Sequence, residues 1–305
     1  MKPDVAVIIA CHTDNAFRIP ALKTNMEYLA GLSNVLYLIN SAQFKGLIEA
    51  ELVADDRYEL HTDLQEPCDW GSDKTHVFIL YRDEDKLFCH GKWADVLQRP
   101  GFPAYSGYIL TNDSFVLLDD LSEFEQLYRS GDYDLVGFID SHERRFHYPD
   151  WLLYYSHAGV RKWLKHFERV RHKCRGFEDV ITFLELATAS LFENKTCLYK
   201  VPAHFRRNMH YVEPMRKRFL MDRGYPVIKL KQLYSYVSGI PSDFDPAVYS
   251  LVNPDLKNHP NVGRHFRKHG MREGRRYKPN QKVCCAEYIS NLIRDRVPAM
   301  RSLVE

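Results

Sequence analysis

The chain lacks any long hydrophobic run and any strong excess of one charge. No apolar stretch approaches the roughly 20 residues that a membrane-spanning helix needs, and the run after Met1 is too short for a signal peptide. Lys and Arg number 42 against 40 Asp and Glu, a formal net charge of +2. This balance excludes a global field that would attract nucleic acid. We therefore expect a cytoplasmic protein without a nucleic-acid partner, whose contact with a membrane would be peripheral.

Cysteine is scarce and irregularly placed. The seven cysteines show neither the paired spacing of a zinc site nor the rhythm of a disulfide framework, so we expect reduced thiols. Two histidine pairs, His142 with His147 and His265 with His269, lack the carboxylate or cysteine partners of a zinc site. We expect no zinc enzyme. Internal repeats and low-complexity tracts are also absent.

Short apolar runs alternate with helical patterns, and this rhythm is typical of an α/β sheet with helices on both faces. The first strand is predicted from Val5 to Cys11, a helix from Arg18 to Leu32 and a second strand from Asn34 to Ile39. These three elements form a βαβ unit. Further strands are predicted over 106–112, 133–139, 151–155 and 196–201, and helices over 74–81, 121–130, 158–170 and 177–192.

The composition changes near residue 240. Gly239-Ile240-Pro241-Ser242 is a turn-rich linker, and a polar, helical pattern follows it. We therefore predict a large α/β domain over residues 1–240 and a small helical C-terminal module over 241–305.

Polar residues directly follow the strand over 106–112. Asn112 and Asp113 place an amide and a carboxylate at the end of this strand, and such oxygens suit a divalent ion that bridges two phosphates. The alternative is that Asn112-Asp113-Ser114 is a polar turn. The tetrapeptide alone leaves both interpretations open.

Two further clusters offer acids and bases. Asp140, Ser141 and His142 follow the strand over 133–139, in a position that suits acceptor binding or proton transfer. Glu178 and Asp179 begin the helix over 177–192, where acidic residues also complement the helix dipole. Glu185 lies seven residues after Glu178, so a regular helix would place both on one face.

Several segments together resemble one family, the rhamnan-synthesis protein F-like glycosyltransferases of polysaccharide and lipopolysaccharide assembly, which have relatives in large algal viruses. The matches occur in the family's order. They are Cys68-Asp69-Trp70-Gly71-Ser72-Asp73-Lys74, Ile109 to Ser114, Val136 to Glu143 with Phe146-His147, Asn208-Met209-His210-Tyr211, and Tyr225-Pro226-Val227-Ile228-Lys229. Phe244 to Tyr249, Asn253 to Leu256 and His265 to Arg275 resemble a module often appended to such enzymes.

The resemblance implies a GT-A-like three-layer sandwich with a Rossmann-like nucleotide-binding half. A UDP- or dTDP-sugar would donate its sugar to a glycan or glycoprotein acceptor in the cytoplasm of a bacterium or a virus-infected host. Asn112 and Asp113 would replace the usual two-aspartate motif that holds Mn²⁺ or Mg²⁺, and His210 would be a further ligand of the metal. The other implied donor-binding residues are His12, Asp69, Trp70, Gly71 and Lys229.

Residues for the acceptor and for catalysis are also expected. Ser141, His142, His147 and Asp150 would bind the acceptor, although Pro149 and Asp150 differ from the family's usual Gln and Ser. The catalytic base would be a carboxylate among Glu178, Asp179 and Glu185, with Asp140 as the next candidate. The alternative function is a non-catalytic glycan-binding or assembly protein on a degenerate glycosyltransferase fold.

Overall fold

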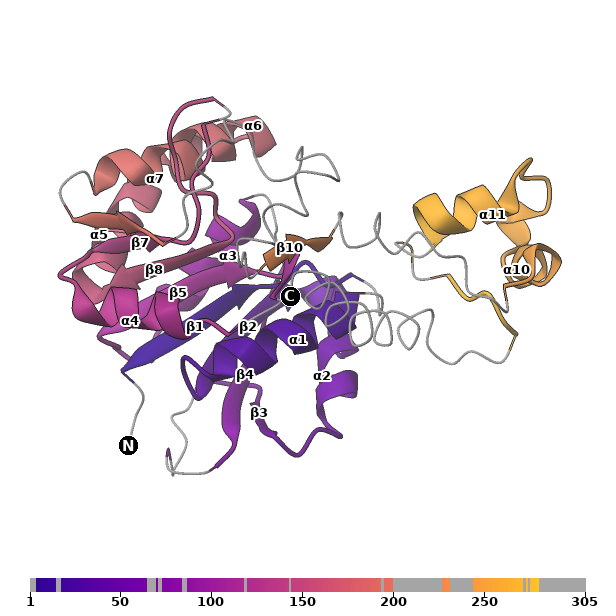
Figure 1. Ribbon diagram of the computed structural model, residues 1–305, viewed down its shortest axis with the longest axis horizontal. Helices are drawn as coiled ribbons and strands as arrows, with labels where there is room; N and C mark the ends of the chain where they lie inside the picture. The colour runs from indigo at the N-terminus through magenta and orange to yellow at the C-terminus, as the bar shows by residue number, and fades with distance from the viewer. Residues whose placement is uncertain are drawn as a thin grey trace, which may run out of the picture.

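An eight-stranded mixed sheet forms the centre of the computed structural model (Figure 1), in the order β3-β4-β2-β1-β5-β8-β7-β9. Its strands are β1 Val5–Ala10, β2 Val35–Ser41, β3 Tyr58–His61, β4 Thr75–Arg82, β5 Gly107–Asn112, β7 Leu135–Gly137, β8 Leu152–Ser156 and β9 Thr196–Leu198. The structure describes residues 4–14, 18–64, 70, 73–83, 87–117, 120–142, 144–192, 195–199, 227–230, 244–270, 273 and 275–279.

The direction of the strands determines which loops meet. The five consecutive strands β3-β4-β2-β1-β5 are parallel to one another, whereas β8 is antiparallel to both β5 and β7. The beginning of β8 therefore lies at the same edge as the carboxyl ends of β5 and β7. A separate ladder pairs β6, Phe115–Leu117, with β10, Val227–Lys229.

Helices cover both faces of the sheet, as the alternation of side chains along β1 requires. Val5, Val7 and Ile9 pack in one hydrophobic core with α1 Ile19–Ala30, α2 Leu47–Leu52 and α4 Ser122–Ser130. The intervening residues of β1 pack in a second core. That core also contains side chains from α3 Phe88–Leu97, α5 His157–Val170 and the segment of α6 Phe177–Val180 and α7 Leu186–Leu191. The three-layer α/β architecture is therefore confirmed.

One predicted helix is wrong. Residues 74–81 were predicted to be helical, but Thr75–Arg82 is strand β4, paired with β2 on one side and β3 on the other. The run His76-Val77-Phe78-Ile79-Leu80 is almost continuously buried. A strand buried on both faces shows no alternation, so periodicity cannot distinguish it from a buried helix.

The helix predicted over 177–192 is interrupted. A five-residue π-helical segment, Ile181–Glu185, lies between α6 and α7. This wider turn changes the spacing on which the shared face of Glu178 and Glu185 depended. The side chain of Glu178 is 68% exposed, whereas that of Glu185 is 14% exposed.

The C-terminal residues described by the structure are helical and have a small core of their own. Helices α10 Pro246–Val252 and α11 Val262–His265 are joined through a 3₁₀ turn, and a π-helical turn follows α11. The rings of Phe244, Tyr249 and Phe266 are in mutual contact, and Tyr277 packs against two of them. The domain boundary near residue 240 lies outside the described residues and stays a prediction.

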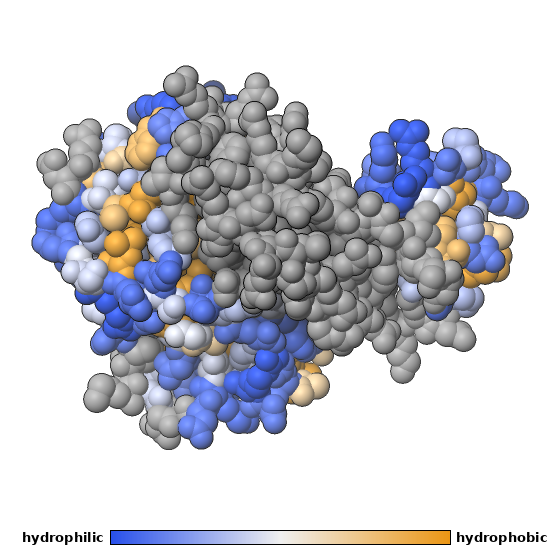
Figure 2. Space-filling model, viewed as in Figure 1, coloured by the Kyte–Doolittle hydropathy of each residue, from blue (hydrophilic) through white to orange (hydrophobic). Residues whose placement is uncertain are grey.

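The face drawn in Figure 2 is largely hydrophilic where residues are described, with smaller hydrophobic areas between. The large apolar side chains exposed in the described ranges include Phe146 and Phe177, whose segments border the site analysed below. Across these ranges, no helix combines the length and apolar composition that a membrane crossing requires.

A buried amide fixes the strand that follows Asp113. The Asn25 side chain on α1 donates to the Phe115 carbonyl at 2.8 Å and accepts from the Leu117 amide at 2.8 Å. Asn25 is 1% exposed, so water cannot replace these bonds. We predict that Asn25→Ala lowers the free energy of unfolding by about 2–4 kcal/mol, because two buried backbone groups lose their partner.

Urea unfolding at constant m-value measures this loss. The control is Gln98→Ala, which removes an amide that donates to Glu168 at an exposed position and should change stability by less than about 0.5 kcal/mol. Equal midpoints for the two variants would contradict the assigned role of Asn25.

Candidate active site

The order of the strands reverses at β1. The chain passes from β1 to β2 on one side and later places β5 on the other side. Open α/β sheets bind ligands at the carboxyl ends of the strands at such a switch point. His12 and Thr13 follow β1, and Asp113 follows β5, so the structure brings residues 100 positions apart to this point.

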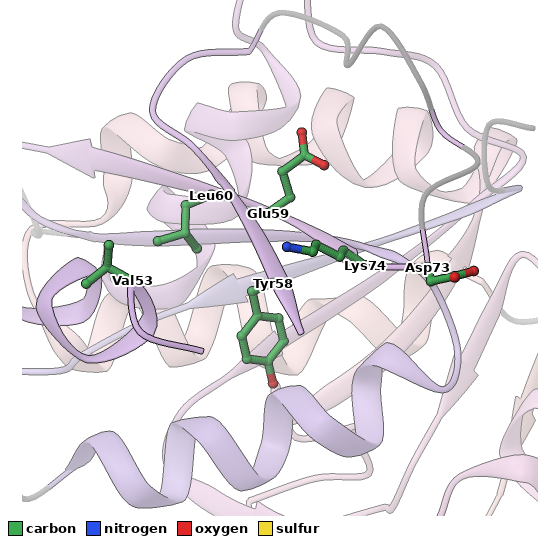
Figure 3. Close-up of a pocket in the computed structure, with 6 residues that line it drawn as sticks. All are labelled: Val53, Tyr58, Glu59, Leu60, Asp73 and Lys74. Atoms are coloured by element: carbon green, nitrogen blue, oxygen red, sulfur yellow. The ribbon is translucent and has the colours of Figure 1, made fainter. Parts of the chain in front are cut away.

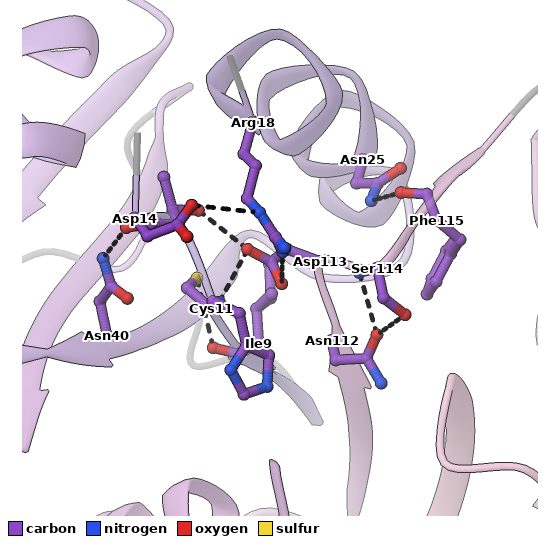
Figure 4. Close-up of polar contacts among 12 residues, drawn as sticks. Ile9, Cys11, Asp14, Arg18, Asn25, Asn40, Asn112, Asp113, Ser114 and Phe115 are labelled. Atoms are coloured by element: carbon purple, nitrogen blue, oxygen red, sulfur yellow. Dashed lines mark hydrogen bonds and ion pairs between the residues drawn. The ribbon is translucent and has the colours of Figure 1, made fainter. Parts of the chain in front are cut away.

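Asp113 is buried at this switch point, with a relative exposure of 1%. Its Oδ2 accepts hydrogen bonds from the His12 backbone amide and the Thr13 hydroxyl, both at 2.8 Å. Its Oδ1 has no hydrogen-bond partner among the residues that the structure describes. Arg18 approaches this oxygen to 3.8 Å from the start of α1 (Figure 4). One oxygen is therefore held by two hydrogen bonds, whereas the other makes no hydrogen bond within the described residues and has only the more distant Arg18 guanidinium near it.

The Asn112 side chain is engaged in the fold. Its Oδ1 accepts from the backbone amide and the hydroxyl of Ser114, and its Nδ2 donates to the Asp150 carbonyl at 2.8 Å. The polar-turn interpretation thus describes Asn112 well. This turn presents Asp113 and connects it to the beginning of β8.

Two basic residues that the sequence analysis did not single out, Arg18 and Lys92, lie at this end of β1. Arg18 is also 3.4 Å from Asp14. Lys92 on α3 is fully buried, donates to the Cys11 carbonyl at 2.6 Å and lies 3.3 Å from His12 Nδ1. The burial of Lys92 could have been predicted from the sequence, because this lysine falls among apolar residues at helical spacing, Cys89, Trp93 and Val96.

A second carboxylate lies at the same edge of the sheet. Asp140 is 9% exposed, and its Oδ2 is 3.0 Å from His142 Nε2. Its Oδ1 is buried and makes no hydrogen bond within the described ranges. Phe146 is 43% exposed, and its ring lies 5.3 Å from that of His142. Ser141 pairs through its backbone with His147.

His147, Glu185 and Asp150 form a third group. His147 Nδ1 donates to the Arg145 carbonyl at 2.8 Å, and its Nε2 lies 3.6 Å from Glu185. Burial opposes the charged imidazolium, but Glu185, the Arg145 carbonyl and Asp150 outweigh it and raise the pKa of His147. The Glu185 carboxylate is therefore occupied by its contact with His147.

Cys89 and His90 extend this group, and the sequence analysis did not identify either residue. The Cys89 thiol donates to Asp150 Oδ2, and His90 Nε2 is 3.8 Å from the same oxygen. Burial and the neighbouring Asp150 raise the pKa of Cys89 well above its ordinary value, so the thiol stays protonated. Both residues lie in the first turn of α3, directly after its first residue Phe88, whose φ of 49° is unusual for an aromatic residue.

The other predicted catalytic carboxylates have partners of their own. Glu178 is exposed and ion-paired with Arg144, and Asp179 accepts from the Arg175 amide at 2.9 Å. The Lys229 backbone pairs with Phe115, two residues after Asp113. The side chain of Lys229 and the whole of Asp69, Gly71 and His210 lie outside the described residues.

Trp70 lies toward the opposite edge of the sheet. Its ring packs against His76, and its carbonyl accepts from Asn34, which precedes β2. Its grouping with the donor residues came from the family resemblance of the loop over residues 68–74. Because β4 is parallel to β3, the loop from β3 must return to the amino end of β4, and it carries Trp70 there.

No protein-family model matches the chain, and the search of curated proteins found no match. Similar solved structures include HddC from Yersinia pseudotuberculosis, with 15% identity over 65% of this chain and 90% of that chain at a TM-score of 0.41. Galactosyltransferase LgtC, solved with donor and acceptor sugar analogues, has 12% identity over 64% and 72% at a TM-score of 0.40. The inositol-1-phosphate CTP transferase of T. maritima has 9% identity over 64% and 84% at 0.42. These likenesses concern the fold.

We predict that the contribution of Glu185 to stability depends on pH through His147. The folded-state pKa of His147 is raised above 6.5, so the stabilisation is fully present below pH 6.5 and is lost as pH rises through the raised value. The stability difference between the unmodified protein and Glu185→Gln should therefore be largest just below pH 6.5, where the carboxylate is still ionised, and should decrease at higher pH.

Urea unfolding over a series of pH values measures this difference. The matched control is Asp132→Asn, which removes a 92% exposed carboxylate paired with Lys195 and should give a small, flat difference. A flat profile for Glu185→Gln as well would show that the two residues are not coupled.

Proposed function

We propose that this chain is a glycosyltransferase that moves a sugar from a UDP- or dTDP-sugar to a glycan acceptor. The observation that carries the proposal is the buried Asp113 carboxylate at the switch point between β1 and β5: one oxygen is fixed by two hydrogen bonds, and the other makes no hydrogen bond within the described residues and lies 3.8 Å from Arg18. Burial of a carboxylate charge is costly in free energy unless a cation lies next to it.

Asp113 and Arg18 form the donor side of the proposed site. A magnesium-type ion needs only one or two protein carboxylates, because phosphate oxygens and water complete its coordination. Asp113 Oδ1 fits this requirement, and Mn²⁺ or Mg²⁺ bound there would stabilise the charge on a departing nucleoside diphosphate. Arg18, with 30% of its side chain exposed, offers a second positive charge to the diphosphate. His12, Asp69, Gly71, Lys229 and His210 stay proposed donor or metal residues.

Asp140 and Phe146 form the acceptor side. Phe146 offers an exposed ring against which the apolar face of a sugar can pack. Asp140 Oδ1 accepts the proton of the acceptor hydroxyl, while the hydroxyl oxygen forms a bond to the anomeric carbon and the bond to the diphosphate breaks. His142 orients Asp140 through Oδ2. We favour Asp140 as the base because Glu185 faces His147 and Glu178 faces Arg144.

The first prediction for this function concerns Asp113. In the unmodified protein, UDP or dTDP together with Mn²⁺ should raise Tm, because a ligand that binds only the native state stabilises it by RT ln(1 + [L]/Kd), about 2.7 kcal/mol at 100 times Kd. Asp113→Asn should lose most of this shift and all sugar transfer, since the amide keeps the size of the side chain but not its charge.

Thermal unfolding with and without nucleotide checks the prediction, and Asp132→Asn serves as the exposed-carboxylate control. If nucleotide raises the Tm of Asp113→Asn as much as that of the unmodified protein, Asp113 is not part of the donor site. A protein that responds to free sugars and ignores nucleotides would instead be a non-catalytic glycan-binding protein.

The second prediction separates the candidate bases. Asp140→Asn should reduce kcat about 10²–10⁴-fold while the nucleotide-induced Tm shift is retained, because a general base acts on the chemical step. Glu178→Gln should keep kcat within a few-fold. Release of nucleoside diphosphate from a panel of donor sugars and glycan acceptors measures turnover. Loss of turnover in Glu178→Gln with retention in Asp140→Asn would reverse the assignment.

A further inference from the structure

Three potential metal ligands meet on one face of β3 and β4. In a strand, residues two apart share a face, so Glu59 and His61 point to the same side of β3. The parallel register pairs Glu59 with His76 of β4, which adds a third side chain to that face. Figure 3 shows the Glu59 side chain on the opposite side of β3 from Tyr58.

The donor atoms of these residues are close enough to share one ion. His61 Nε2 lies 3.1 Å from His76 Nδ1. One carboxylate oxygen of Glu59 lies 3.7 Å from His61 Nε2, and the other lies 3.6 Å from His76 Nδ1. Ligand atoms around a tetrahedral zinc ion with bonds of 2.0–2.1 Å are about 3.3 Å apart. The three separations are near this value.

Neighbouring rings hold the two imidazoles in place. His61 stacks on Phe78 with ring centroids 4.6 Å apart, and the Trp70 ring packs edge-on against the fully buried His76. The Glu59 side chain is 44% exposed, so an ion can reach this carboxylate from solvent.

We propose that Glu59, His61 and His76 bind one zinc-type divalent transition-metal ion, with a further position open to water. Two imidazoles and a carboxylate suit zinc better than the oxygen-preferring magnesium and calcium. Binding displaces the proton that otherwise lies between the two histidine nitrogens. The site lies at the β3 edge of the sheet, whereas the proposed donor site lies between β1 and β5.

The location indicates a structural role for the ion. Strand β3 is four residues long and, within the described residues, has β4 as its single neighbour. An ion bound to two side chains of β3 and one of β4 would attach this short edge strand to the sheet. Metal removal should therefore lower stability even where nucleotide binding is unaffected.

Elemental analysis of the full chain, purified without chelator, tests the proposal. We expect about one zinc per chain, near-complete loss in His61→Ala and in Glu59→Gln, and full retention in His269→Ala, which changes an exposed histidine of the C-terminal module. After chelation, zinc at about 100 times Kd should raise Tm by about 5 °C in the unmodified protein and by much less in His61→Ala. Circular dichroism establishes that each variant is folded.

The second group of potential ligands, Cys89, His90 and Asp150, is the competing location. Cys89→Ala should keep its zinc, and the cobalt-substituted protein should lack the sulfur-to-metal charge-transfer band that a cysteine ligand gives. Zinc lost in Cys89→Ala but kept in His61→Ala would overturn the proposal, as would no zinc uptake at all. Asp113→Asn should keep its zinc. The zinc test is therefore independent of the proposed glycosyltransferase activity, and either proposal can fail without the other.

Discussion

The candidate site depends on one carboxylate that joins the ends of two neighbouring strands. Asp113 follows β5, and its Oδ2 binds the backbone and side chain that follow β1. A buried carboxylate is costly to place in a protein unless hydrogen bonds and charges compensate it. Arg18 and the fully buried Lys92 supply positive charge at the same end of β1. Oδ1, which makes no hydrogen bond within the described residues and has Arg18 nearby, is the oxygen that we propose for the ligand.

A second constraint is the single antiparallel strand of the large sheet as described. Because β8 runs against β5 and β7, its first residues lie at the edge where those strands end. The Asn112 amide spans this junction by donating to the Asp150 carbonyl. The groups proposed for the donor and those proposed for the acceptor are thus connected through one side chain. A change in the turn that Asn112 forms would displace both sides together.

The sequence predicted the elements whose apolar residues have a visible period or clear boundaries. Strands β1 and β5 and helix α1 were predicted to within two residues, and Asp113 and Asp140 were placed at strand ends for the right physical reason. Strand β4 was missed because it is buried on both faces. The direction of β4 also decides where the preceding loop leads, and it places Trp70 at the amino end of that strand.

The remaining features depend on contacts that the sequence does not show. The π-helical segment before α7 changes the helical spacing between Glu178 and Glu185, and no residue pattern predicted this segment. His61 and His76 are 15 residues apart, and only the register of β3 with β4 brings them together. The pairing of Cys89 with Asp150 likewise requires the packing of α3 on the sheet.

The most direct test of the account is anomalous diffraction from crystals grown with UDP or dTDP and Mn²⁺. The account predicts one manganese peak within bonding distance of Asp113 Oδ1, in contact with the diphosphate and close to Arg18. A nucleotide bound away from the ends of β1 and β5, or a manganese ion without contact to Asp113, would contradict it.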